Sequence, residues 1–86
     1  MNREDALLDK AYKNSRKFAD ENGYGFMEPS MGNSGCEKHE GNEYVVLRNT
    51  TEILSVWLVE NGDKISPVDD EDLPESLQEE LSYCNA

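Results

Sequence analysis

Few side chains in this sequence could bind a metal ion or act as a nucleophile. Cys36 and His39 stand three positions apart in a glycine-rich segment, and Cys84 is the other cysteine. A structural zinc site normally uses four Cys or His ligands in two close pairs, whereas this chain has three such residues in all. No neighbouring group would orient a Cys–His nucleophile pair or form an oxyanion site. These three residues are therefore weak metal candidates, and we expect no cofactor, no bound metal and no enzymatic activity.

Carboxylates dominate the charge of the chain. Its 86 residues include 19 acids and 8 bases, which give a formal net charge of −11. Residues 1–42 carry six bases against eight acids, whereas residues 43–86 carry two bases against eleven acids. This negative field repels phosphate groups, so direct binding to nucleic acid or to an anionic membrane is disfavoured. The expected partner is instead a basic protein surface.

The acids are densest between Asp69 and Glu80, where twelve positions hold seven carboxylates and no base. Leucines recur at four-residue steps in this region, which predicts a short helix over about 72–83 that packs its leucine face on the rest of the protein. These leucines are Leu73, Leu77 and Leu81. Asp72 stands at capping-box spacing before Glu75, so the predicted helix also has a start signal. Its acids must then face solvent.

The outer face of this predicted helix is a candidate surface for a basic partner. Glu79 and Glu80 lie toward the end of the helix, where the helix dipole disfavours acids by a few tenths of a kcal/mol each. Local helix stability therefore does not account for them, whereas solubility or a basic partner would. The predicted acidic surface consists of Asp69, Asp70, Glu71, Asp72, Glu75, Glu79 and Glu80.

The combination of small size, strong acidity and few catalytic groups resembles many phage-encoded inhibitors of nucleases, including anti-CRISPR and anti-restriction proteins. The resemblance is one of composition and involves no sequence motif. It implies a non-enzymatic inhibitor that occupies a nucleic-acid-binding surface on its target.

The first half of the chain is predicted to be one helix and one long loop. Apolar residues recur at three- and four-residue steps over about 2–22, which predicts an amphipathic helix that Asn2 caps and Gly23 ends. Residues 23–42 hold five of the six glycines and show no periodicity. They are expected to form a long loop, whose second part, about 32–42, looks loose.

Residues 43–68 are predicted to form a three-stranded antiparallel β-meander. The segments 43–49 and 52–60 are rich in β-branched and aromatic residues, and Asn61-Gly62 is a strong hairpin signal. A two-residue turn there sets the register of the second and third strands, and a two- or four-residue turn near Thr50 sets the register of the first and second. The two registers agree, because they place the same apolar residues on one face. Pro67 would end the third strand or place it at an edge. The registers predict one apolar face made of Val45, Leu47, Leu54, Val56, Leu58 and Ile65.

The opposite face of this predicted meander offers an alternative binding surface. It would carry Tyr44, Arg48 and Trp57 among smaller side chains. Aromatic residues and arginine are enriched where binding energy concentrates in interfaces. We favour the interpretation in which the loop over 23–42 or the last helix partly covers this face. The alternative is that the face binds another protein or a second copy of the chain.

Taken together, the sequence predicts one small α+β domain over residues 1–86. Its elements are an N-terminal amphipathic helix, a three-stranded β-meander and a short acidic C-terminal helix. The longest nearly apolar run, residues 53–59, is far shorter than the roughly 20 residues that cross a membrane. The opening residues lack a signal-peptide pattern. We therefore expect a cytoplasmic protein whose cysteines are free thiols.

Overall fold

The computed structural model describes residues 2–23, 25–50 and 52–84, and for Asp70 and residues 81–84 it describes the backbone alone. Helix α1 (Arg3–Asn22) begins after Asn2, whose Oδ1 accepts the N–H of Asp5 at 2.8 Å. It ends at Gly23, which adopts the left-handed φ of 73° that glycine tolerates best. Both ends are where the sequence predicts them. No helix in the described ranges is both long and apolar enough to cross a membrane.

Four antiparallel strands, and not the predicted three, form a meander in the order β1-β2-β3-β4. The extra strand is β1, which lies inside the predicted long loop. A two-residue turn, Glu40 and Gly41, joins it to β2 with φ values of 54° and 84°. Glycine is usual at such a turn but glutamate is not, which is why the sequence pattern does not predict this hairpin. The strands are β1 (Gly35–His39), β2 (Asn42–Arg48), β3 (Ile53–Glu60) and β4 (Lys64–Pro67).

The register between β2 and β3 shifts by one residue within β3. Arg48 pairs with Ile53 across a four-residue connection, one of the two lengths predicted. The next pair along is Leu47 with Ser55, so Leu54 is an extra residue in β3 and forms a β-bulge. Every pair beyond the bulge is displaced by one position. The predicted register pairs Leu47 with Leu54 and Val45 with Val56, and both of these pairs are therefore wrong.

The register between β3 and β4 also differs from the prediction. Glu60 pairs with Lys64, so the connecting turn has three residues, whereas Asn61-Gly62 predicts two. Asn61 and Gly62 both have positive φ, at 53° and 85°, and the chain needs one more residue before pairing resumes. Pro67 is the last residue of β4, as predicted.

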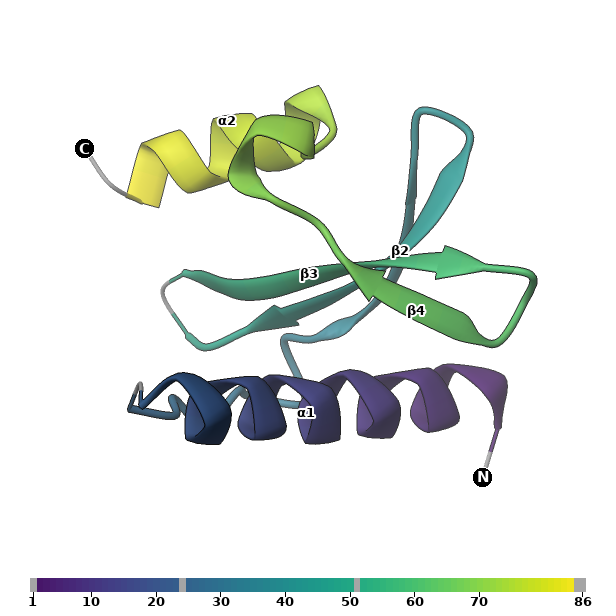
Figure 1. Cartoon of the computed structure of the whole chain (residues 1–86). Coiled ribbons are helices and arrows are strands. Elements are labelled where there is room, and N and C mark those ends of the chain that lie inside the picture. The colour runs from purple at the N-terminus through teal and green to yellow at the C-terminus, as the bar shows by residue number, and fades with distance from the viewer. Residues whose placement is uncertain (1, 24, 51, 85–86) are drawn as a thin grey trace.

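These shifts divide the predicted apolar face between the two sides of the sheet. Figure 1 shows the sheet lying between α1 on one side and α2 (Glu75–Cys84) on the other. The α1 side buries Leu7, Leu8, Ala11, Val45, Leu47 and Trp57. The α2 side buries Tyr44, Val46, Ile53, Val56, Leu73 and Leu77. Each helix therefore has its own small core, and the sheet is covered on both faces.

Helix α2 begins at Glu75, slightly later than predicted, so Asp72 lies in the preceding turn and not at the predicted capping position. Residues Asp70–Asp72 form a separate 3-10 turn, η1, in which the N–H of Asp72 donates to the carbonyl of Asp69 at 2.9 Å. Pro74 then precedes α2 and is fully buried. Leu73 and Leu77 are buried on the sheet as predicted, whereas the side chain of Leu81 lies outside the described part of the chain.

Candidate interaction surface

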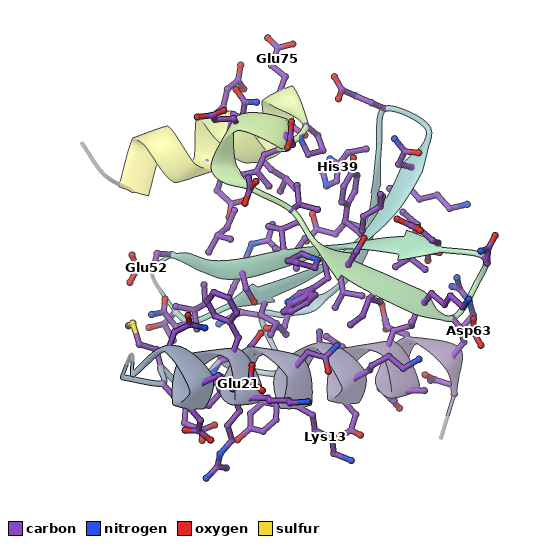
Figure 2. The ribbon with its side chains drawn as sticks, in the orientation of Figure 1. Lys13, Glu21, His39, Glu52, Asp63 and Glu75 are labelled. Carbon is purple, nitrogen blue, oxygen red and sulfur yellow. The ribbon has the colours of Figure 1, made fainter. Side chains whose placement is uncertain are left out.

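The acidic surface predicted over residues 69–80 lies on the side of the sheet away from α1. It comprises the approach to η1, η1 itself and the outer face of α2. In Figure 2, Glu75 projects outward from α2, and Lys13 projects from the opposite side of the molecule on α1. Five of the seven predicted acids are exposed: Asp69, Glu71, Asp72, Glu75 and Glu79. Among the described side chains, no base lies within ion-pair distance of these five.

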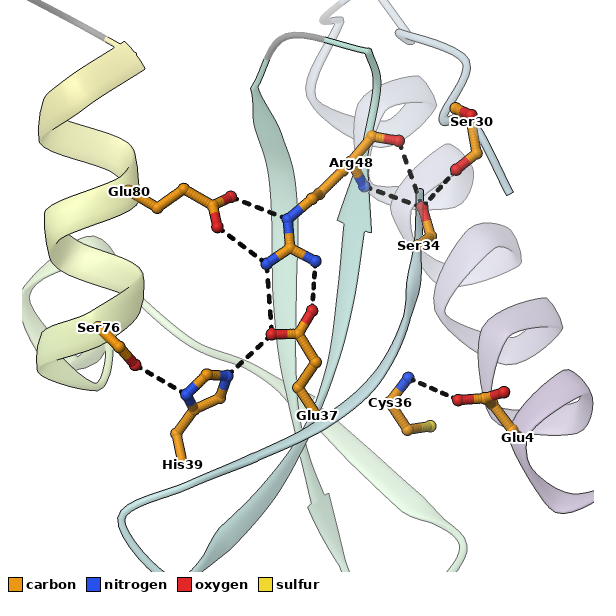
Figure 3. Close-up of polar contacts among 9 residues, drawn as sticks. All are labelled: Glu4, Ser30, Ser34, Cys36, Glu37, His39, Arg48, Ser76 and Glu80. Carbon is orange, nitrogen blue, oxygen red and sulfur yellow. Dashed lines mark hydrogen bonds and ion pairs between the residues drawn. The ribbon is translucent and has the colours of Figure 1, made fainter. Parts of the chain in front are cut away.

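Glu80 differs from these five acids because it has a partner inside the protein. Arg48 on β2 donates from Nε to Glu80 Oε2 at 2.8 Å and from Nη2 to Glu80 Oε1 at 3.1 Å. Figure 3 shows this forked contact between the strand and the helix. The pair accounts for an acid that the helix dipole disfavours. Glu80 therefore helps to hold α2 on the sheet, whereas Glu79 keeps the solvent exposure predicted for it. The side chain of Asp70 lies outside the described residues.

Arg48 also binds a carboxylate from β1, which links three elements. Both Arg48 and Glu37 are partly buried, and the guanidinium contacts Glu37 through Nη1 and Nη2. The hydrogen bonds that Arg48 donates to Glu37 and, to a lesser extent, to Glu80 raise the pKa of Arg48. The hydrogen bond from Arg48 lowers the pKa of Glu37, and the contact with His39 lowers it further. The partly buried Arg48 thus lies between two acids and offsets the repulsion that they would otherwise exert on each other.

His39 extends this network to the start of α2. Its Nε2 lies 2.9 Å from Glu37 Oε1, and its Nδ1 lies 2.7 Å from Ser76 Oγ. A hydroxyl, an imidazole and a carboxylate in this order also occur in hydrolase relays. Here, however, Glu37 is held by Arg48, and none of these side chains lines the cavity described below. The two contacts of His39 therefore join β1 to the first turn of α2 (Figure 3).

The alternative binding face predicted around Tyr44, Arg48 and Trp57 does not exist as one face. Trp57 lies on the α1 side of the sheet, whereas Tyr44 and Arg48 lie on the α2 side. The bulge at Leu54 causes this separation, because it reverses the side to which Trp57 points. Tyr44 and Trp57 are only 6% and 8% exposed. Both aromatic rings are core residues of this chain, so they do not form the exposed face that the sequence predicts.

The weak metal candidates are not brought together either. Cys36 and His39 are three residues apart in β1, so they point to opposite faces of the sheet. Cys36 packs against the α1 core, where burial raises the pKa of its thiol, and its N–H donates to Glu4 Oε2 at 3.2 Å. The side chain of Cys84 lies outside the described residues. Within the described residues, no cluster of three or more His, Cys, Asp or Glu could hold a metal ion.

The fold separates the neutral part of the protein from its acidic part. Helix α1 carries five acids and five bases, so its net charge is zero. Several of its bases are engaged with acids or carbonyls nearby. Arg3 forms a forked contact with Glu43, Lys10 donates to the carbonyl of Asp63, and Lys13 pairs with Asp9. Helix α1, whose charges balance, and the acidic segment that includes α2 therefore lie on opposite faces of the sheet (Figure 1).

A cavity of about 400 Å³ opens between α1 and the point where β4 leaves the sheet. Ser15, Phe18 and Ala19 of α1 form one wall, and Pro67, Val68 and Asp69 form part of the other. The sequence pattern does not predict this cavity, because the cavity depends on where the chain turns after Pro67.

Comparison of the chain with protein-family models, curated proteins and solved structures finds no match. Inference about its function therefore depends on the geometry and charge described above.

Proposed function

We propose that this chain is a small, non-enzymatic interaction protein that uses its α2 side to bind a basic surface on another protein. The proposal is carried by one observation. Five exposed carboxylates, which form no ion pair with any described side chain, occur on a segment anchored to the sheet. The buried Leu73 and Leu77 and the pair between Arg48 and Glu80 supply the anchors. An anchored surface loses less conformational entropy on binding than a flexible acidic tail would lose.

The proposed partner is a nucleic-acid-binding protein, and the proposed effect is inhibition. Such proteins carry clustered lysine and arginine side chains that meet phosphate groups. A rigid acidic surface can occupy the same positive field and exclude the nucleic acid. The compositional resemblance to small phage-encoded inhibitors of nucleases supports this choice of partner. Complementary charge also accelerates association and makes it sensitive to salt.

Affinity capture from a lysate of the native host, followed by elution with a salt gradient, tests this function. We expect a basic, nucleic-acid-binding protein to be captured at low salt and released between about 0.1 and about 0.5 M salt, because salt screens exposed charges over this range. The purified partner should then lose nucleic-acid binding when this chain is added. Capture that persists at high salt, or a captured partner that is not basic, would rule the proposal out.

A further inference from the structure

The cavity beside α1 exists because β4 is short. Proline has no N–H to donate, and β4 ends at Pro67, which pairs with Trp57. One further hydrogen bond joins Val68 to the carbonyl of Val56 at 3.0 Å, and the chain then turns away toward η1. Within the described chain, the first residues of β3 therefore have no strand beside them on that edge. The end of α1 and residues 25–29 form the facing wall.

The lining of this groove is apolar, and part of it is unusually exposed. Phe18 and Met27, which lie at the groove, are 56% and 55% exposed although both are large apolar side chains. Trp57 and Leu54 also line it, from β3. Exposed apolar side chains gathered around a cavity mark binding sites more often than the scattered exposed residues found on any surface. Methionine adapts readily to different occupants.

The charge at the groove indicates which kind of occupant fits. Among the described residues, its lining includes one charged residue, Asp69, and no base. Asp69 is also the first residue of the proposed acidic surface, so the groove and that surface are continuous. On the facing wall, Arg16 stacks over Phe26 at 6.0 Å from the ring centroid, and Lys17 lies 3.9 Å from Glu21. The unbalanced charge beside the groove is therefore negative, and it comes from the wall that contains Asp69.

We propose that the groove binds an apolar side chain of a protein segment flanked by lysine or arginine, whose basic residues meet the acids that begin at Asp69. This inference depends on the proposed function, because it assigns the groove to the same basic partner. It adds a second, apolar component of recognition. Charge alone would make binding fast and salt-sensitive, whereas an apolar anchor would make it selective among basic partners.

Two peptides of equal length and charge test this inference. The first contains lysine and leucine, and the second contains lysine with serine in place of each leucine. Trp57, the only tryptophan of the chain, lines the groove and reports on its occupancy through fluorescence. We expect the leucine peptide to bind about tenfold more tightly than the serine peptide, since one buried leucine accounts for a difference of that order. It should also shift the emission of Trp57, and the serine peptide should not.

A matched pair of variants assigns the site. Met27→Lys places a positive charge in the groove, and Met31→Lys makes the same change at another exposed methionine outside it. We expect Met27→Lys to abolish the preference for the leucine peptide and Met31→Lys to retain it. Equal preference in both variants would overturn the proposal.

Three further outcomes would also overturn the proposal, and the first of them leaves the proposed function standing. If both peptides bind equally and binding weakens with salt, the acidic surface stands and the groove has no part in it. If neither peptide binds, both proposals fall. If a neutral apolar dye shifts the Trp57 emission while the two peptides remain equivalent, the groove is a small-molecule site instead.

Discussion

Arg48 and Glu80, which are 32 positions apart in the sequence, form a forked ion pair that fastens α2 to β2. The pair divides the acids of the C-terminal segment into two kinds. Glu80 stabilises the fold, and its exposed neighbour Glu79 does not contribute to it in the same way. Any test of the acidic surface must therefore avoid Glu80, since changing it would confuse lost binding with lost structure.

The pair predicts that Glu80→Gln is destabilising and Glu79→Gln is not. Removing the charge at Glu80 should lower the free energy of unfolding by about 0.5 to 1 kcal/mol, the upper range for partly exposed ion pairs. Glu79→Gln should leave it unchanged or raise it slightly, because it removes an acid from the end of a helix. Urea unfolding followed by Trp57 fluorescence measures both values. Equal losses for the two variants would show that Arg48 does not anchor α2.

The lowered pKa of Glu37 predicts a dependence of stability on pH. A carboxylate whose pKa is lower in the folded state stabilises the fold above its unfolded pKa and loses this effect as pH falls through its folded pKa. The difference in unfolding free energy between wild type and Glu37→Gln should therefore be constant at neutral pH and shrink below the ordinary glutamate pKa of 4.5. Urea unfolding at a series of pH values gives this difference. A difference that grows on acidification would contradict the assigned ion pair.

The burial of Trp57 predicts that Trp57→Ala is severely destabilising. Truncating a buried aromatic residue costs about 3 to 5 kcal/mol, a large part of the stability of a small domain. Phe18→Ala provides the comparison, because Phe18 is more than half exposed and should cost much less. Thermal unfolding followed by circular dichroism compares the two variants. A folded Trp57→Ala protein with an unchanged melting temperature would instead place Trp57 at the surface.

The extra strand β1 makes a further prediction at its turn. Gly41 has a φ of 84°, so Gly41→Ala should cost about 1 to 2 kcal/mol because the side chain strains this conformation. Gly25→Ala is the matched control, since Gly25 has an ordinary φ and open space around its α-carbon. Urea unfolding should show a loss only for the first variant. If the two behaved alike, β1 and its turn would not have the described geometry.

Local signals in the sequence predicted several elements correctly. Asn2 and Gly23 mark the ends of α1, Pro67 ends β4, and Leu73 and Leu77 are buried as predicted, Leu77 on α2 and Leu73 just before it. Each of these features depends on residues within a few positions of one another. The α+β architecture followed from them.

The features that the sequence did not predict depend on contacts between distant residues. The bulge at Leu54 leaves both flanking segments strand-like, and only the packing of each sheet face selects the shifted register. The partner of Glu80 is a strand residue that its own helix pattern cannot identify. The groove likewise requires α1, β3 and the chain after Pro67 to meet. Helix and strand periodicity contain no information about contacts between segments that are distant in the sequence.

The most direct test of the acidic surface compares two double variants of equal charge change. Glu71→Lys with Glu79→Lys alters exposed acids on the α2 side, and Asp20→Lys with Glu21→Lys alters exposed acids on α1. The measurement is the amount of basic protein that each variant captures from host lysate at about 0.05 M salt, where charge interactions are weakly screened. We expect the first variant to lose the captured protein while remaining folded, and the second variant to retain it. Equal capture by the two variants would show that the acids of the α2 side do not bind the partner.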